Sequence, residues 1–307
     1  MIDQLYTQAK ELLEHGDFRQ ARDLGHQLLK ARFSGAFEIL AASFRGEGAL
    51  DVAITVLENG TKEAPGVWPL WMQLGNYLSE AGKLNEAVQA YQKARACPGS
   101  DQDQIDFNEA YMRMCYGNKE RCLELFARVI KETEDRRLRL VALKHRLCTL
   151  IDLDQVTGAL MELGDARLHD ADNAELLTTL SLKLLDTGDK ANALNLARQA
   201  LGLKRAGKAA RVLRKLEGEP CERCDVFRVI MRGHIDDDDK RHSFLKTSEV
   251  YAESEEEAGK LAVDFEPPDV RPDLSIEEVT KQGQAIGEPK GVDWSSGLML
   301  FEDGESP

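Results

Sequence analysis

The residues best suited to chemistry lie close together in the last third of the chain. Cys221 and Cys224 form a C-x-x-C pair, and His234 and His242 follow them. Two thiolates and two imidazoles make a ligand set that structural zinc binds in a tetrahedral arrangement. However, the histidine spacing matches no standard zinc finger, and the sequence holds no second C-x-x-C. We therefore favour two free thiols and keep a zinc site as the alternative.

Other sequence patterns for catalysis are missing. The chain contains no G-x-S-x-G, Walker A, H-E-x-x-H or kinase pattern, and its histidines do not neighbour a serine or cysteine in a known motif. The acidic run DDDDK at residues 236–240 lacks the ligand pattern of an EF-hand, so we interpret it as a charged hairpin loop. We expect a protein that is not an enzyme and that binds no cofactor.

The negative charge is concentrated near the C terminus. Residues 1–217 carry 30 Lys and Arg against 31 Asp and Glu, whereas residues 218–307 carry 10 against 23, which accounts for the net charge of −14. An acidic chain repels phosphate groups, so we expect no nucleic acid partner despite a basic cluster within residues 136–146. The break in composition predicts a domain boundary between residues 217 and 218.

The chain shows no sign of export or of a membrane span. No stretch approaches the roughly 20 apolar residues that a span needs. The first residues place Asp3 where a signal peptide would carry positive charge. The six cysteines form no regular framework, which is typical of a reducing compartment. We expect a cytoplasmic protein that does not act on membranes.

A helical pattern precedes the cysteine pair and is clearest in residues 68–98. Trp71, Leu74 and Leu78 recur at the three- and four-residue spacing of one helix face. Gly75 lies where a second helix would cross closely, and Gly82 lies at the turn, where glycine takes a positive φ without strain. The order Trp, Leu, Gly, Leu, Gly, Ala, Tyr, Ala, Pro resembles the tetratricopeptide repeat.

The same template fits about six times. Its starts are spaced by about 32 to 37 residues, close to the usual 34. The turn positions are Gly16, Gly48, Gly82, Gly117, Asp154 and Gly188. The fold class is therefore mostly α, a tetratricopeptide superhelix over residues 1–217. A helix over residues 205–216 is expected to cap it, or alternatively to present a basic binding surface.

Beyond Pro220 the hydrophobic period changes from helix to strand. Residues 225–235 and 243–252 predict two strands, residues 254–265 a helix with a capping box, and residues 274–280 a third strand. We expect a small acidic α+β domain of unrecognised family over residues 218–285, followed by an irregular acidic tail over residues 286–307. Its charge should dock it on the basic capping helix at low salt.

The resemblance implies where a partner would bind. In tetratricopeptide arrays, protein or peptide ligands lie on the concave surface that the first helix of each repeat lines. The positions that the resemblance places there are Tyr6, Lys10, Glu38, Arg45, Met72, Asn76, Phe107, Tyr111, Met114 and Lys144. The middle of this set is apolar and aromatic, as the anchors of a recognition groove are. Packing between neighbouring repeats would use the same residue types.

Two functions are consistent with these observations. The first is a protein-protein interaction scaffold or adaptor that binds its partner in the groove. The alternative is a metal-dependent or catalytic C-terminal module for which the array recruits substrate. The partner and the oligomeric state are left open.

Overall fold

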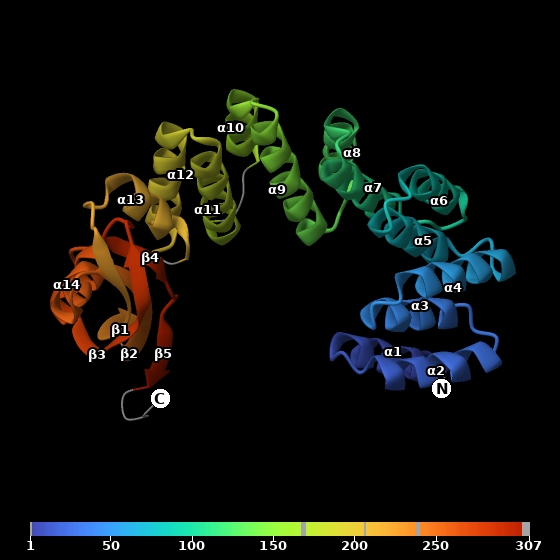
Figure 1. Cartoon of the computed structure of the whole chain (residues 1–307), viewed down its shortest axis with the longest axis horizontal. Helices are drawn as coiled ribbons and strands as arrows, with labels where there is room; N and C mark the ends of the chain where they lie inside the picture. Colours follow the sequence, from blue (N-terminus) through green and yellow to red (C-terminus); the bar gives the residue numbers. More distant parts are fainter. Residues whose placement is uncertain (1, 167–169, 206, 238–239, 303–307) are drawn as a thin grey trace. The chain divides into compact units, whose positions relative to one another are not determined.

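The computed structural model describes residues 2–166, 170–205, 207–237 and 240–302. A series of helices leads into an antiparallel sheet with one further helix, as Figure 1 shows. The helices before the sheet are α1 (Ile2–Glu14), α2 (Phe18–Lys30), α3 (Ala36–Gly46), α4 (Leu50–Glu63), α5 (Trp68–Glu80), α6 (Leu84–Ala96), α7 (Gln102–Tyr116), α8 (Lys119–Glu132), α9 (Arg136–Asp152), α10 (Val156–Asp165), α11 (Asp170–Thr187), α12 (Lys190–Leu203) and α13 (Ala209–Glu217). Then follow β1 (Arg223–Asp237), β2 (Lys240–Ala252), α14 (Glu255–Phe265), β3 (Ser275–Ile286), β4 (Gly291–Ser295) and β5 (Met299–Glu302).

Hairpins are formed by α1 with α2, α3 with α4, α5 with α6, α7 with α8, and α11 with α12. The predicted turn residues lie at the reversals. Gly16, Gly48, Gly82, Gly117 and Gly188 have φ between +75° and +96°, and Asp154 has φ +58°. The same bonding recurs at these turns: Lys83 N donates to Leu78 O at 2.8 Å, for example, which satisfies a carbonyl that the helix end leaves free. The repeat register and the mostly helical fold class are confirmed.

Close approach inside the hairpin α5–α6 depends on Gly75. A Cβ atom at this position would lie 2.8 Å from the ring of Tyr91, which is itself 1% exposed. The Tyr91 hydroxyl donates to Asn76 Oδ1 at 2.8 Å. Ala87, on the facing side of α6, is fully buried. Small residues therefore let the two helices pack, as the sequence predicts.

By compactness the chain divides into residues 1–149 and residues 150–307, and each unit is described by itself. The second unit contains α10 to α13 together with the sheet. The domain boundary between residues 217 and 218 stays a prediction. Among the described helices, none has the length and apolar composition that a membrane span requires.

In the second unit, β1 lies inside the sheet and pairs antiparallel with both β2 and β3. The order is β3-β1-β2-β4, with β5 also pairing with β2. Phe227, Val229 and Met231 of β1 pack with Ala258 and Ala262 of α14 to form the core of the sheet. The three predicted strands and the predicted helix are confirmed, and Ser254 caps α14 by accepting from Glu257 N at 3.2 Å. Within the predicted DDDDK loop, residues 238–239 lie outside the described residues.

The prediction of an irregular tail over residues 286–307 is wrong for the two strands found there, and residues 303–307 lie outside the described residues. Residues 291–295 and 299–302 form β4 and β5, which extend β2 on its free edge. Val292 is 5% exposed and joins the core. Glycine, aspartate and serine are poor strand formers on their own, so backbone pairing and burial against the sheet decide the structure of this segment.

Helix α13 begins at Ala209, four residues later than expected, and it packs against the sheet as well as on α12. Its Ala210 belongs to the core of the sheet. Arg214 donates from Nε and Nη2 to Asp293 Oδ1 at 2.9 and 2.7 Å, and from Nη1 to Glu288 Oε2 at 2.9 Å. Arg211 donates to the other oxygen of Asp293. The expected contact between the basic helix and the acidic region is present.

This contact is buried, contrary to the expectation of a salt-sensitive surface pairing. The side chains of Arg214 and Asp293 are 2% and 1% exposed. The guanidinium also lies over the ring of Tyr251, 3.9 Å from its centroid. Hydrogen bonds from both arginines hold the pKa of Asp293 below its ordinary value although burial acts in the opposite direction. Such a pair is screened by salt much less than an exposed one.

Candidate partner-binding surface

The positions that the family resemblance places on the groove lie on α1, α3, α5, α7 and α9. All of them belong to the first compact unit, residues 1–149. Successive first helices contact one another, α1 with α3, α3 with α5, and α5 with α7. The stacking of the hairpins therefore brings the N-terminal and middle positions onto neighbouring helices. The side chains differ in whether they are available to a partner.

The N-terminal positions are joined to one another. The Tyr6 hydroxyl donates to Glu38 Oε2 at 3.2 Å, and the Lys10 ammonium lies 5.1 Å from the centre of the Tyr6 ring. Tyr6 also packs edge-on against Phe33, with ring centres 5.3 Å apart. Burial, followed by the charge of Glu38, raises the pKa of Tyr6 to about 12. Tyr6 and Glu38 thus link α1 to α3, and of these three side chains only Lys10 is exposed.

Two of the positions further along the surface serve the packing of the repeats. Asn76 accepts the hydroxyl of Tyr91 and so stabilises its own hairpin. Met72 accepts a hydrogen bond at Sδ from Asn108 Nδ2, 3.2 Å away on α7, and packs against the buried core. Arg45 is exposed and donates to Glu80 at 3.1 Å.

The last positions gather around an aromatic cluster, which we define as Phe107, Tyr111, Phe126 and His145. The His145 ring stacks on Phe126 with centres 5.9 Å apart, and Tyr111 meets it edge-on at 5.3 Å. Phe126 is fully buried, and Phe107 and Met114 pack against its core as half-buried side chains. Tyr111 is 46% exposed. Inter-repeat packing therefore explains Phe107 and Met114 but leaves much of Tyr111 uncovered.

His145 was missed by sequence reasoning, which considered the histidines only as catalytic or metal-binding residues. It follows Lys144, a half-buried position that the resemblance places on the surface. Moving the predicted surface position by one residue along α9 would have identified His145. Burial among the aromatic rings lowers the pKa of His145, and the charge of Lys144 lowers it further. The cluster therefore favours a neutral imidazole.

The four candidate zinc ligands of the second unit do not come together. His234 lies ten residues beyond Cys224 on β1, roughly 30 Å away at about 3.3 Å per residue. His242 pairs with Ile235 at the same end of the hairpin. Among the described residues, no group of three or more His, Cys, Asp or Glu could hold a metal ion. The zinc interpretation is wrong for this set.

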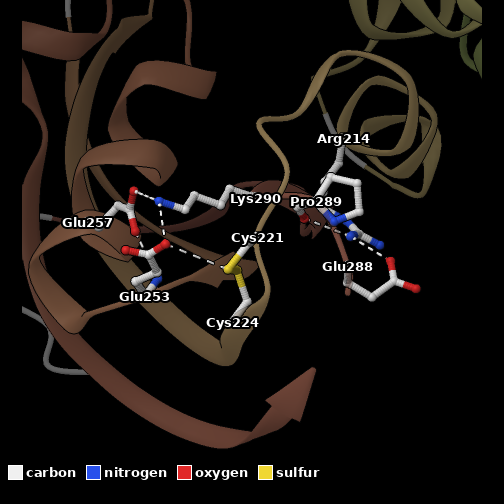
Figure 2. Close-up of a disulfide and its surroundings, with 8 residues drawn as sticks. All are labelled: Arg214, Cys221, Cys224, Glu253, Glu257, Glu288, Pro289 and Lys290. Atoms are coloured by element: carbon white, nitrogen blue, oxygen red, sulfur yellow. Dashed lines mark hydrogen bonds and ion pairs between the residues drawn. A yellow bond between two sulfur atoms is a disulfide. The ribbon is translucent and has the colours of Figure 1, made fainter. Parts of the chain in front are cut away.

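Cys221 and Cys224 form a disulfide, so the interpretation as free thiols is also wrong (Figure 2). Both residues are buried, and their Cα atoms are 6.0 Å apart. Glu253 Oε1 lies 3.9 Å from Cys221 Sγ and is paired at 3.1 Å with Lys290, which also contacts Glu257. The disulfide thus fixes the entrance to β1 beside the segment that leads into β4.

Comparison with solved structures finds the same type of helical array. The type IV pilus biogenesis factor PilW is 17% identical with a TM-score of 0.50, over 66% of this chain and 92% of that one. The Pseudomonas aeruginosa protein pilF is 16% identical with a TM-score of 0.49, over 66% and 92%. A thermophilic TPR protein of Thermus thermophilus is 23% identical with a TM-score of 0.44, over 48% and 82%.

No protein-family model matches the chain, and no curated protein matches its sequence. At sequence identities this low, similarity to the solved structures shows the fold alone. The fold likeness agrees with the consecutive hairpins and with the left-handed residue at each turn. The helical part of the chain has the tetratricopeptide repeat fold.

Proposed function

We propose that the first compact unit is an adaptor that binds a protein or peptide partner on its first helices, with Tyr111 as the central anchor. One observation carries the proposal: Tyr111 is 46% exposed, yet its ring is held edge-on by His145. A large aromatic side chain that its neighbours already fix loses little conformational entropy on binding. Hot-spot residues of interfaces have this property.

The fold supports the same class of function. PilW, which shares this fold, is a type IV pilus biogenesis factor. A role as scaffold or adaptor in a protein assembly is the corresponding proposal for this chain, and it comes from the fold and the exposed anchor together. The exposed side chains of Lys10 and Arg45 would add polar contacts at the rim.

The proposal includes three further points. The adaptor acts in the cytoplasm, has no catalytic activity of its own, and uses the acidic region after residue 217 for a second contact or for regulation. Counting thiols in protein that is acid-quenched directly from cells tests the compartment. The Cys221–Cys224 disulfide of the structure leaves four free thiols, and finding only these four in the cell would count against a reducing cytoplasm. Six free thiols would show that the disulfide is reduced in the cell and would agree with that compartment.

A photo-crosslinking experiment tests the binding surface. Benzoylphenylalanine replaces Tyr111 in one full-length variant and Tyr116 in another, and captured proteins are identified by mass spectrometry. Tyr116 is the matched control, because it is also 46% exposed on α7 but lies outside the aromatic cluster. We expect a partner to be captured from position 111 and not from position 116.

Measuring the affinity of that partner for variants of the protein then shows how much Tyr111 contributes to binding. Tyr111→Ala should weaken binding by about 1 to 3 kcal/mol, a typical cost for truncating an aromatic anchor, and Tyr116→Ala should leave it unchanged. The far-ultraviolet circular dichroism of both variants should match the wild type. If Tyr111→Ala loses helicity together with binding, Tyr111 belongs to the repeat core and the proposal fails.

A further inference from the structure

The second compact unit contains a mostly apolar cavity of about 320 Å³. Three segments surround it: the two residues that follow α12, the chain that leaves α14, and the loop between β4 and β5. The core-facing side of β2 forms its floor. The lining residues are Lys204, Arg205, Phe244, Lys246, Glu266, Pro267, Val270, Ser296, Gly297 and Leu298.

The floor of this cavity carries a buried ion pair. The side chains of Lys246 and Glu266 are 3% and 5% exposed. The Lys246 ammonium donates to Glu266 Oε2 and to the carbonyl oxygen of Arg205, both at 2.7 Å. Glu266 Oε1 lies 2.6 Å from the same ammonium but outside hydrogen-bond geometry. Lys246 and Glu266 therefore pair with each other in the floor of the cavity.

The rim carries positive charge that the protein does not neutralise. Arg205 donates from Nε to the carbonyl oxygen of Phe265, and its guanidinium lies over the Phe265 ring, 5.0 Å from the centroid. In the described chain, its terminal nitrogens have no hydrogen-bond partner, and Lys204 beside it is exposed. Since Glu266 balances Lys246, the two rim cations are in excess. An anion is the ligand that such a field selects.

The walls between floor and rim are apolar. Pro267, Val270 and Leu298 provide them above Phe244 of the floor, and Leu298 is 47% exposed at the opening. The volume lies at the lower end of the range for small-molecule sites, so it suits a short branched group and not a long chain. The cavity therefore joins one apolar compartment to an anion-attracting rim.

We propose that this cavity binds a carboxylate carried by a short, branched apolar group. The carboxylate pairs with Arg205 and Lys204, and the branched group fills the space between Phe244, Val270 and Leu298. The C-terminal residue of a peptide and a small free carboxylic acid both have these two features, and the experiment distinguishes them. This site lies in a different compact unit from the aromatic cluster and does not depend on the proposed groove.

Calorimetric titration of the full-length protein tests the proposal with three probes. They are N-acetyl-alanyl-leucine, the same dipeptide with a C-terminal amide, and 4-methylpentanoate, which has the carboxylate and the branched group but no N–H. We expect the acetylated dipeptide to bind at least tenfold more tightly than its amide. If the acetylated dipeptide also binds tenfold more tightly than 4-methylpentanoate, the site is assigned to peptide C termini. Equal affinity for these two probes assigns it to free carboxylic acids.

Two variants and one control locate the binding. Arg205→Gln removes a positive charge from the rim and should weaken binding of the acetylated dipeptide at least fivefold. Leu298→Trp fills the opening of the cavity from an exposed position. It should also weaken dipeptide binding at least fivefold, without contacting the pair of Lys246 and Glu266. Arg228→Gln is the control, because Arg228 is exposed on the face of β1 that points away from the core. It should change the affinity by less than twofold.

Three results would overturn the proposal. They are the absence of binding of either carboxylate at millimolar concentration, equal affinity for the amide, and equal effects of Arg205→Gln and Arg228→Gln. Melting temperatures of all variants are measured alongside. If Arg205→Gln is unstable, Leu298→Trp decides alone, and unchanged affinity in that variant counts against the site.

Discussion

Different interactions stabilise two parts of the molecule: the hairpins of the first compact unit, and the contact between α13 and the sheet in the second. In the hairpins, small residues at fixed spacing let apolar faces meet, as Gly75 does against Tyr91. At the joint, charged side chains far apart in sequence meet in a buried place, as Arg214 does with Asp293. Apolar packing tolerates many substitutions of similar volume, whereas a buried charge needs its specific partner.

The largest effect is expected from breaking the buried pair. Arg214→Met leaves the carboxylate of Asp293, 1% exposed, with only the half-exposed Arg211 as a partner. We expect the second unit to lose about 3 to 5 kcal/mol of unfolding free energy. Urea unfolding followed by Trp294 fluorescence measures this in a chain whose other two tryptophans, Trp68 and Trp71, are replaced by Phe.

An exposed pair of the same chemistry is the control. Arg198 on α12 pairs with Glu217, and both side chains are largely exposed. Arg198→Met should cost at most about 1 kcal/mol. Raising the salt concentration to 1 M should also leave α13 on the sheet, because the Arg214 pair is buried. Equal losses for the two arginine variants would contradict the contrast between buried and exposed charge.

A smaller effect is expected from overfilling a hairpin. Gly75→Leu places a side chain where a Cβ alone would already lie 2.8 Å from Tyr91. Overpacking of this kind costs about 1 to 3 kcal/mol, which thermal unfolding followed by circular dichroism would detect. Gly66→Leu is the control, since a Cβ at Gly66 meets no atom within 4 Å. A Gly75→Leu variant with an unchanged melting temperature would show that the register of the array is wrong.

A lower pH should destabilise the first unit through His145. The unfolded imidazole titrates near pH 6.5, and burial lowers the pKa in the folded state. Well above pH 6.5 the imidazole is neutral in both states and the effect is absent. As the pH falls below that value, the unfolded state takes up a proton that the folded state resists, so stability falls until the folded-state pKa is reached.

The comparison variant for this effect is His145→Gln, which cannot titrate. Denaturant titrations at a series of pH values from 8 to 5 give the stability of each protein. The stability difference between wild type and variant should shrink as the pH falls. A difference that does not change with pH would mean that His145 protonates freely within the aromatic cluster.

The smallest effect is expected at the one described repeat turn that lacks glycine. Asp154 has φ +58°, a conformation that strains most side chains but that aspartate tolerates. Asp154→Gly removes the strain, while the added freedom of glycine in the unfolded chain offsets about 0.4 to 1 kcal/mol of the gain. We expect a net stabilisation of about 0.5 kcal/mol. Gly82→Ala, which introduces strain at the corresponding turn, should destabilise instead.

The sequence predicted the local features of the hairpins but not the long-range contacts of the second unit. The turn residues and Gly75 were predictable because each acts within its own hairpin, where local spacing carries the information. The Arg214–Asp293 pair joins residues 79 positions apart, and β4 is a strand only because it pairs with β2. His145 was missed because its ring contacts come from α7 and α8. Composition placed the acidic region beside a basic helix but could not show that their contact is buried.

Helix α13 packs both on α12 and against the sheet, which limits where the chain can be divided. A truncated chain that ends at residue 217 keeps Arg214 and loses both of its carboxylate partners, Asp293 and Glu288. A fragment that begins at residue 218 loses Ala210 from the core of the sheet and uncovers Val292. Cutting there should give two poorly soluble pieces. A fragment that carries the sheet must therefore begin before α13, and the last repeat is then left with an apolar face that requires a new cap.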